Sequence, residues 1–570
     1  MRSQNGVENE AKRNSFIYVT VAIVIFVIGI IKTKIGIHSD EIHSIAVADM
    51  IARGDRIFKD CWFYLQLSSV ISAPFIWIYR HVAGSAEGLI LFLRIISVLI
   101  QGGICSLFYI TFSKQRNRLY VFAAAVCLFM FIPDFLSFGY KPEMIWFTIL
   151  EIIFAYRYCV YKKNKDLIFL GIAISLCVLA FPTAVIHFLA WMVLFFKRKD
   201  DRKKAVSYII LSCVCCAAIF FMFTLAEISI GDFFRFFPEI LKDDQLASNF
   251  ITKLFHPIAK ITVLGIVSIT PLVIVARISI FRDFIKKFRI PVITALLVLA
   301  FLGQCYIERL GITWHCITYP YALTLFFLPY AYMTDMPKNR INNKELFWCF
   351  SVMSWASFFC FSLASNQGNI TSIYAGVISM CGLLVLLASN SASPAFCERT
   401  PIAVSLCIMA FVMFAIPVWD QEAIYPETYG MRTVFSDRIL IEKGPAKGIW
   451  VGQEMYDNYI NLCDIIDKEV TSDDKVYIVD SAYYCSFGYI YQPGEYATYS
   501  PRGGYFDRIV EYYDVNKEKK PSIVIMSKNY IKDWEKGEFP YDREIYKYLS
   551  ENNYVEEDMD NFIVFSNKRN

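Results

Sequence analysis

The sequence predicts a polytopic α-helical membrane protein that ends in a separate α/β domain outside the membrane. Hydrophobic residues make up 56% of the 570 residues and charged residues 19%, whereas soluble domains have about 45–50% and about 25%. Long apolar runs alternate with short basic segments, which is typical of membrane proteins with many spans. From about residue 419 the pattern changes to short β-rich runs between helix-like stretches. The net charge of +4 gives no indication of nucleic-acid binding.

About thirteen apolar runs are candidates to cross the bilayer, which takes about 17–25 residues each. The first follows Lys12 and Arg13, but no small-residue cleavage site comes after it, so we expect an uncleaved helix behind a cytoplasmic tail, 1–15. The fifth and sixth runs are short and separated by Pro182, and together they can instead form one bent hairpin. The runs are 16–37, 86–112, 119–138, 143–160, 167–182, 183–196, 205–225, 258–276, 290–306, 314–333, 345–364, 370–389 and 401–418.

The basic segments predict the orientation of the membrane domain, 16–418. With thirteen spans, all five basic segments fall on the same side of the membrane as the N-terminus. The positive-inside rule predicts that this side is cytoplasmic. The other loops, and everything after Pro417, then face outward. The stretch 65–84 is apolar and aromatic but contains Pro74; we expect it to lie in the interface, because a further span would turn the basic segments outward. These segments are 113–118, 161–166, 197–204, 277–289 and 337–344.

The first outer loop, 38–85, opens with "SDEIHSIAVADMIARG". Ser39 is a suitable N-cap and Gly54 a suitable residue after the last turn, so we expect a helix over 40–53.

Two carboxylates and two histidines stand directly behind the first apolar run. Asp40 and Glu41 are adjacent and are flanked by His38 and His43. One interpretation is a polar helix start, favoured by the helix dipole. The other is a reaction centre at the membrane surface. His38 and His43 can also be ordinary interfacial residues rather than metal ligands.

The C-terminal part, 419–570, is long enough for a domain of its own, and its alternating pattern predicts a small α/β layer. No glycine-rich phosphate loop follows its strands, so nucleotide binding has no support. Cys463 and Cys485 either pair or remain free thiols. We expect strands at 475–480, 521–527 and 562–567, and helices at 452–469, 504–516 and 541–552.

No motif of a common soluble enzyme is present in the sequence. It has no P-loop, no HExxH zinc helix, no GxSxG elbow and no dinucleotide fingerprint. No Cys/His spacing suggests zinc. The carboxylates at the outer membrane surface are therefore the leading candidates for chemistry.

These residues carry a resemblance to a known superfamily. "SDEIHSIAVADMIARGDRIFKDCWFYLQLSS", "APFIWIYRHVAG" and "LFLRIIS" resemble the first outer loop and second span of C-type (GT-C) glycosyltransferases, such as protein O-mannosyltransferases and the aminoarabinose lipid A transferase. Members have an Asp-Glu pair after the first span, a small-residue helix ending near Gly, and an early Arg in the second span. The counterparts here are Asp40, Glu41, Gly54 and Arg94.

The resemblance covers the membrane part in layout, roughly 1–420, with specific motifs only over about 38–100. It implies a glycosyltransferase that takes a sugar from a polyprenyl-phosphate donor to a glycan, lipid or protein acceptor at the outer face. The domain layout favours a bacterial plasma membrane. The resemblance also implies that Asp40 is the catalytic base, with Glu41 and Glu143 as further catalytic carboxylates. Glu143 lies in "YKPEMIWF", where Asp is more usual. Some relatives use a divalent metal, but the sequence names no ligands for one.

The chemistry of such a transfer agrees with these residue types. A base takes the acceptor proton while an oxocarbenium-like centre forms, and cations stabilise the leaving phosphate. Lys141 and Arg309 stand at outer span ends and are candidates for this role; Arg94 and His43 are further substrate-binding candidates, and Arg235 is a weaker one. Arg94 can instead snorkel to the surface, and Arg309 can simply pair with its neighbouring glutamate.

A different class, a transporter or lipid flippase with an external binding domain, remains the alternative, and a scaffold whose outer domain binds cell-wall polymer is a third. Transporters place ionisable groups and broken helices near the bilayer midplane. The mid-span positions here are almost free of charge, with Glu151 the main exception. Transfer of a labelled lipid-phosphate sugar would separate an enzyme from both. The sequence leaves open the sugar, the acceptor, the lipid chain length and the oligomeric state.

Overall fold

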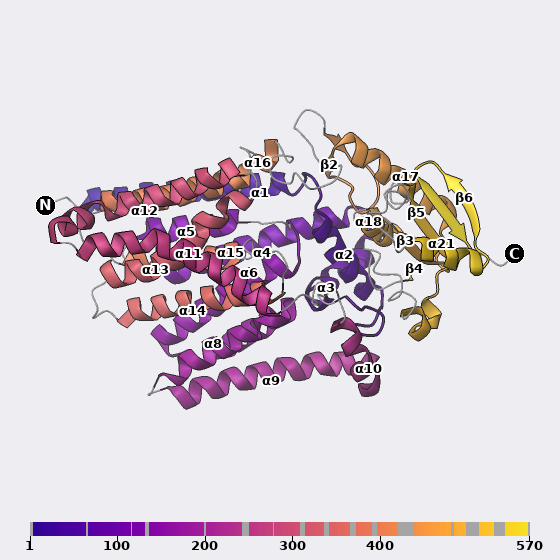
Figure 1. Cartoon of the computed structure of the whole chain (residues 1–570), viewed down its shortest axis with the longest axis horizontal. Helices are drawn as coiled ribbons and strands as arrows, with labels where there is room; N and C mark the ends of the chain where they lie inside the picture. Colours follow the sequence, from indigo (N-terminus) through magenta and orange to yellow (C-terminus); the bar gives the residue numbers. More distant parts are fainter. Residues whose placement is uncertain are drawn as a thin grey trace.

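The molecule is elongated, with a helical bundle at one end of its long axis and a sheet-containing domain at the other (Figure 1). The computed structural model describes residues 4–63, 66–115, 117–131, 136–198, 201–241, 250–277, 279–307, 314–335, 341–364, 372–389, 396–419, 438–479, 484–497, 512–528 and 542–567.

The apolar runs of the sequence coincide with the helices of the bundle. Among the described residues, four helices are long and apolar enough by themselves to cross a membrane: α4, α6, α9 and most of α14. The number of spans beyond these four stays a prediction. Pro182 begins a 3₁₀ turn that separates α7 from α8. The bundle helices are α1 (Gln4–Lys32), α4 (Leu89–Phe112), α5 (Arg118–Met130), α6 (Tyr140–Tyr161), α7 (Asn164–Ala180), α8 (Val185–Phe196), α9 (Arg202–Glu227), α11 (Phe250–Arg277), α12 (Ser279–Ile307), α13 (Thr318–Asp335), α14 (Ile341–Ala364), α15 (Ser372–Ser389) and α16 (Phe396–Trp419).

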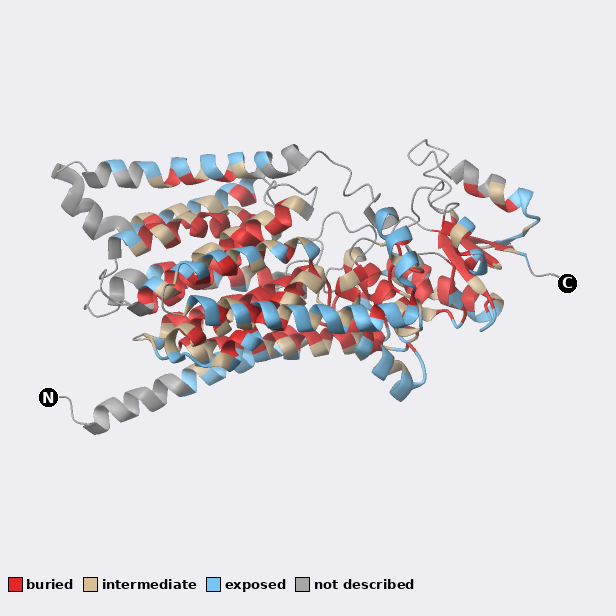
Figure 2. Cartoon of the chain, turned by 90° about the horizontal axis from the view of Figure 1, so that it is seen from below, coloured by how far each residue is buried: buried red, intermediate tan, exposed pale blue. Residues whose placement is uncertain are grey.

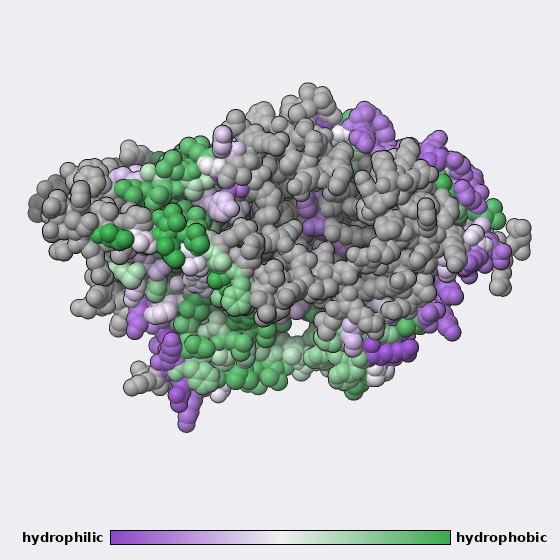
Figure 3. All heavy atoms as spheres, viewed as in Figure 1, coloured by the Kyte–Doolittle hydropathy of each residue, from purple (hydrophilic) through white to green (hydrophobic). Residues whose placement is uncertain are grey.

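The surface of the bundle is apolar where a lipid tail would meet it. Buried residues fill the interior, while the outward faces of the outer helices are exposed (Figure 2). Large apolar side chains such as Phe16 on α1 and Leu211 and Phe223 on α9 are exposed. Hydrophobic residues gather over the bundle and hydrophilic ones over the far end of the other domain (Figure 3). An apolar surface of this extent agrees with a membrane protein.

Three of the basic segments meet at one end of the bundle. Lys114 donates a hydrogen bond to the Tyr161 hydroxyl at 2.8 Å. Lys162 forms an ion pair with Asp201, and Arg198, at the end of α8, pairs with a glutamate at the start of α14. These three basic segments therefore lie on the same side of the bundle, as the charge pattern predicts. The cytoplasmic location of that side stays a prediction.

The orientation can be tested with cysteines introduced at exposed positions on the two sides. In intact cells, a membrane-impermeant maleimide should label Lys468→Cys, on the C-terminal domain, and spare Lys203→Cys, at the start of α9. After lysis both should react equally above the wild-type background. Labelling of Lys203→Cys in intact cells would overturn the topology.

Two helices lie between the bundle and the sheet (Figure 1): α2 (Ser39–Ala52) and α3 (Gln66–Ala83). Ser39 is not the N-cap, as the sequence suggested, because α2 already includes it and the cap position belongs to His38. Gly54 has the predicted role after the helix, with a φ of 109° that favours glycine. The sequence analysis missed α10 (Ile230–Leu241), whose Phe233 ring packs 4.9 Å from that of Phe58.

The C-terminal domain is built on a five-stranded mixed sheet with the order β4-β3-β5-β7-β6. β3 is parallel to β4 and β5, while β7 is antiparallel to β5 and β6. The structure confirms one part of the predicted α/β domain, namely a small sheet near the C-terminus. The predicted strands correspond to β3, β5 and β7; β4 and β6 were missed, and most of the predicted helix 504–516 lies outside the described residues. The elements are α17 (Gln453–Glu469), β3 (Lys475–Val479), α18 (Tyr484–Tyr491), β4 (Glu495–Tyr496), β5 (Ile523–Ser527), α21 (Asp542–Glu551), β6 (Val555–Met559) and β7 (Phe562–Ser566), preceded by the pair β1 (Ile439–Leu440) and β2 (Trp450–Val451).

Candidate active site at the junction of the bundle and the outer domain

A buried ion pair joins the start of α2 to α4. Arg94 donates from Nε and Nη2 to the two carboxylate oxygens of Glu41, at 2.8 and 2.6 Å. Both side chains are fully buried. Arg94 Nη1 also donates to the carbonyl oxygens of Thr33 and Gly36, at 3.0 and 2.8 Å. A planar guanidinium suits this arrangement, because it directs several donors at fixed angles. One side chain thus fixes the end of α1, the connecting segment and the first turn of α2.

The outer domain holds the same connecting segment from the other side. The Gly36 amide donates to the Trp450 carbonyl at 2.9 Å, and the Trp450 amide donates to the Lys34 carbonyl at 2.7 Å. β2 therefore pairs with the segment just before α2. The backbone that leads to Asp40 is held both by Arg94 and by the outer domain.

Asp40 is the accessible carboxylate of the three that the sequence singled out. Its side chain is 24% exposed, whereas the side chains of Glu41 and Glu143 are buried. Lys141, in the first turn of α6, places its Nζ 3.9 Å from Asp40 Oδ2 and is itself only 4% exposed. The fold therefore brings together an acid and a cation that lie about a hundred residues apart in sequence.

Glu143 lies in the same first turn of α6 as Lys141. It is fully buried, and its carboxylate has no side-chain hydrogen-bond partner among the described residues; the backbone amide of Gly139 interacts with it. Burying a polar group without a partner costs free energy. Such a group is a candidate for contact with a ligand.

His43 stands one turn after Asp40 on α2. Its ring packs edge-on against Phe63 at 4.5 Å between centroids, and neither ring nitrogen has a hydrogen-bond partner among the described residues. Burial lowers the pKa of His43 to about 4, so the imidazole is neutral near pH 7. A neutral ring offers no positive charge to a phosphate. Arg309 lies outside the described residues.

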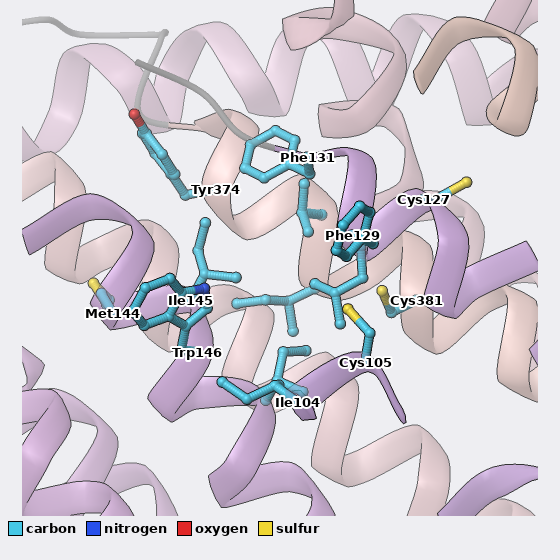
Figure 4. Close-up of a cluster of buried hydrophobic side chains, with 14 of the residues drawn as sticks. Ile104, Cys105, Cys127, Phe129, Phe131, Met144, Ile145, Trp146, Tyr374 and Cys381 are labelled. Atoms are coloured by element: carbon cyan, nitrogen blue, oxygen red, sulfur yellow. The ribbon is translucent and has the colours of Figure 1, made fainter. Parts of the chain in front are cut away.

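A small pocket opens between α4 and α6, with Pro142 from the first turn of α6 in its lining. Its walls include Phe131, Ile145 and Trp146, which lie in one cluster of apolar side chains (Figure 4). Ser97 Oγ and Gln101 Oε1 are buried there with no hydrogen-bond partner among the described residues. The lining is Ser97, Val98, Gln101, Phe131, Leu136, Ser137, Pro142, Ile145 and Trp146.

Some of the residues that line the pocket are close in sequence to the charged residues. Ser97 is three residues beyond Arg94 on α4, and Pro142 stands between Lys141 and Glu143 on α6. Mainly apolar walls suit the apolar part of a ligand.

The outer domain is also attached to the far end of α2. Asp49, fully buried, accepts hydrogen bonds from Arg80 at 2.5 and 2.8 Å and from the Tyr496 hydroxyl at 2.5 Å. Arg53 donates to the carbonyl oxygen of Gln492 at 3.2 Å. The sequence analysis missed these residues; the available signal was an acidic residue within the apolar stretch "AVADMIA".

The fold of the chain is similar to that of solved structures. It is similar to ArnT from Cupriavidus metallidurans bound to undecaprenyl phosphate, with 11% identity, a TM-score of 0.51 and 98% coverage of both chains. The apo state of the same protein gives 11% identity, the same coverage and a TM-score of 0.50. A weaker likeness, with 12% identity and a TM-score of 0.42 over 90% of this chain and 70% of the other, extends to the oligosaccharyltransferase AglB from Archaeoglobus fulgidus.

No protein-family model matches the sequence, and no curated protein matches it. ArnT belongs to the GT-C superfamily, so the resemblance that the sequence suggested is confirmed at the level of the fold. The likeness covers 98% of the chain and so extends into the outer domain, which the sequence resemblance did not reach.

Proposed function

We propose that the protein is a membrane glycosyltransferase that moves a sugar from a polyprenyl-phosphate donor to an acceptor at the outer face of the plasma membrane. The observation that carries the proposal is the partly exposed Asp40 with Lys141 Nζ at 3.9 Å, together with a pocket of mainly apolar walls that includes Pro142 in its lining. The fold adds support, because the similar ArnT structure contains undecaprenyl phosphate. The acceptor is a glycan, a lipid or a protein.

In the proposed reaction, Asp40 accepts the proton of the acceptor hydroxyl as that oxygen bonds to the anomeric carbon. The bond from this carbon to the phosphate oxygen breaks, and its electron pair leaves with polyprenyl phosphate. Lys141 stabilises the negative charge that grows on the leaving phosphate. No nucleotide is consumed, because the lipid phosphate is itself the leaving group.

The other carboxylates have different roles in this proposal. Glu41 is committed to Arg94, so both act as positioning residues that fix the backbone before Asp40. Glu143, without a side-chain hydrogen-bond partner among the described residues, faces the donor and orients it or holds a divalent ion. The outer domain, joined to both ends of α2, covers this face and helps to select the acceptor.

The proposal is tested with the purified full chain in lipid nanodiscs and a panel of labelled undecaprenyl-phosphate sugars, with cell-envelope fractions as acceptors. We expect label to appear in an acceptor, with undecaprenyl phosphate released in equal amount. The transporter alternative predicts the opposite result in vesicles: the labelled lipid changes leaflet and its sugar–phosphate bond stays intact.

Lys141→Met should weaken the binding of undecaprenyl phosphate by roughly 10- to 100-fold. Methionine keeps most of the volume but removes the charge, and a hydrogen bond to a charged group contributes about 1.5–3 kcal/mol. Binding can be measured by native mass spectrometry. The matched control is Lys447→Met, which removes an exposed lysine paired with Glu87 on the surface and should change nothing. Equal binding by both variants would remove Lys141 from the proposed site.

A further inference from the structure

A second cluster of reactive side chains lies inside the bundle, away from Asp40. Glu151 of α6, Cys177 of α7 and His187 of α8 are all buried, and one ligand atom of each lies within 4.8 Å of the others. Glu151 is eight residues beyond Glu143 along α6, about 12 Å at the rise of a helix. The proposed transfer reaction uses none of the three.

The distances from His187 Nδ1 to the other two ligands are close to those that one small metal ion imposes. His187 Nδ1 lies 3.3 and 3.2 Å from the two Glu151 oxygens and 3.7 Å from Cys177 Sγ. In tetrahedral zinc sites the bonds are about 2.0–2.1 Å to nitrogen, about 2.0–2.2 Å to oxygen and about 2.3 Å to sulfur. Two such ligand atoms are then about 3.4 Å apart for nitrogen and oxygen, and about 3.6 Å apart for nitrogen and sulfur.

Neighbouring side chains fix the orientation of the three ligands. The Trp191 Nε1–H donates to Glu151 Oε2 at 2.8 Å. His187 Nε2 lies 3.1 Å from the Ser357 hydroxyl of α14. When Nε2 carries the proton and donates it to Ser357, Nδ1 presents its lone pair toward the Glu151 carboxylate. A cation between Nδ1 and the carboxylate relieves that repulsion, and outer hydrogen bonds of this kind are usual around metal-bound histidine.

The charges also suit a divalent ion. A carboxylate from Glu151 and a thiolate from Cys177 carry two negative charges, and a neutral His187 carries none. A divalent cation makes the group neutral overall, which a low-dielectric helix interior tolerates far better than an isolated charge. A simple Glu151–His187 ion pair explains two of the three residues, while the Cys177 thiol makes only long contacts outside the cluster, at 3.9 Å to the Met144 carbonyl and 3.8 Å to Thr148 Oγ1.

We propose that Glu151, Cys177 and His187 bind a divalent transition ion, with Zn²⁺ the best match to this mixed N, O and S ligand set. The ion would cross-link α6, α7 and α8 in the middle of the bundle. Cys177 releases its thiol proton to solvent as the ion binds. The three ligands leave a fourth position on the ion open, and the site is independent of the proposed sugar transfer.

The test measures metal in the full-length protein, purified in detergent without chelators and then exposed to Zn²⁺ or Co²⁺. We expect about one ion per chain and, with Co²⁺, the intense absorption of a cobalt–thiolate bond. Cys177→Ser should lose both. The matched control, Cys213→Ser, removes a partly buried thiol of α9 that donates to the Gly171 carbonyl at 3.5 Å and lies outside the cluster, and it should keep both.

A second variant separates metal loss from misfolding. Glu151→Gln keeps the side-chain shape and the acceptor for Trp191 but removes a charged ligand. Added Zn²⁺ should raise the Tm of the wild type and of Cys213→Ser, because the ion binds the folded state, and should leave the Tm of Glu151→Gln and Cys177→Ser unchanged. The proposal fails if the wild type binds neither ion, or if Cys177→Ser retains one ion with an unchanged cobalt spectrum.

Discussion

Asp40→Asn should transfer sugar at least a hundredfold more slowly than the wild type and still insert, fold and bind the donor. Asparagine keeps the shape and hydrogen bonding of the side chain but cannot take a proton from the acceptor hydroxyl. The loss of a general base typically costs on the order of 10²–10⁴-fold in rate. The loss of a charge that only complements a helix N-terminus costs about 0.3–1 kcal/mol of stability. Initial transfer rates at matched protein levels in nanodiscs measure the difference.

A control for this prediction is Glu454→Gln, which neutralises an exposed acid in the first turn of α17. It changes the helix dipole interaction in the same way and lies outside the junction, so it should leave the transfer rate unchanged. Binding of undecaprenyl phosphate to Asp40→Asn should stay close to that of the wild type. Near-normal turnover of Asp40→Asn would mean that the acid only stabilises the helix start, and that the mechanism proposed here is wrong.

The membrane part was predictable because its signal is local and strong. An apolar run of spanning length identifies a helix almost regardless of its neighbours, and each predicted run coincides with one in the structure. The outer domain was harder, because its strands are short and their signals are weak. β4 has two residues, and β6 reads "VEEDM", whose charges suit an exposed edge strand but give no hydrophobic pattern.

The members of the candidate site were predictable, but most of their contacts were not. The GT-C resemblance named Asp40, Glu41 and Arg94 from motifs that lie close together in sequence. The pairing of Arg94 with Glu41, and of Lys141 with Asp40, depends on how the helices pack, which no local pattern encodes. The same holds for Trp450, whose backbone holds the segment before α2 from another domain.

Glu41→Gln should destabilise the folded protein by about 3–5 kcal/mol, because it leaves the Arg94 guanidinium buried without its counter-charge. The apparent free energy of unfolding can be measured by adding SDS to the protein in mixed micelles. The matched control is Glu87→Gln, which breaks the ion pair with Lys447 at 2.8 Å. Both partners of that pair are about half exposed, so water replaces the lost interaction and the control should show no measurable change.

The double variant Glu41→Leu/Arg94→Met tests what the buried pair contributes. Apolar residues of similar size remove both charges together, so most of the ionic penalty should disappear. Recovery should be incomplete, because the carbonyl oxygens of Thr33 and Gly36 lose their donor, at about 1–3 kcal/mol for each group left buried and unsatisfied. The double variant should therefore fold better than Glu41→Gln and still transfer sugar slowly, since the backbone before Asp40 is no longer fixed by Arg94. If Glu41→Gln is as stable as Glu87→Gln, the buried pair does not stabilise the fold and does not position Asp40.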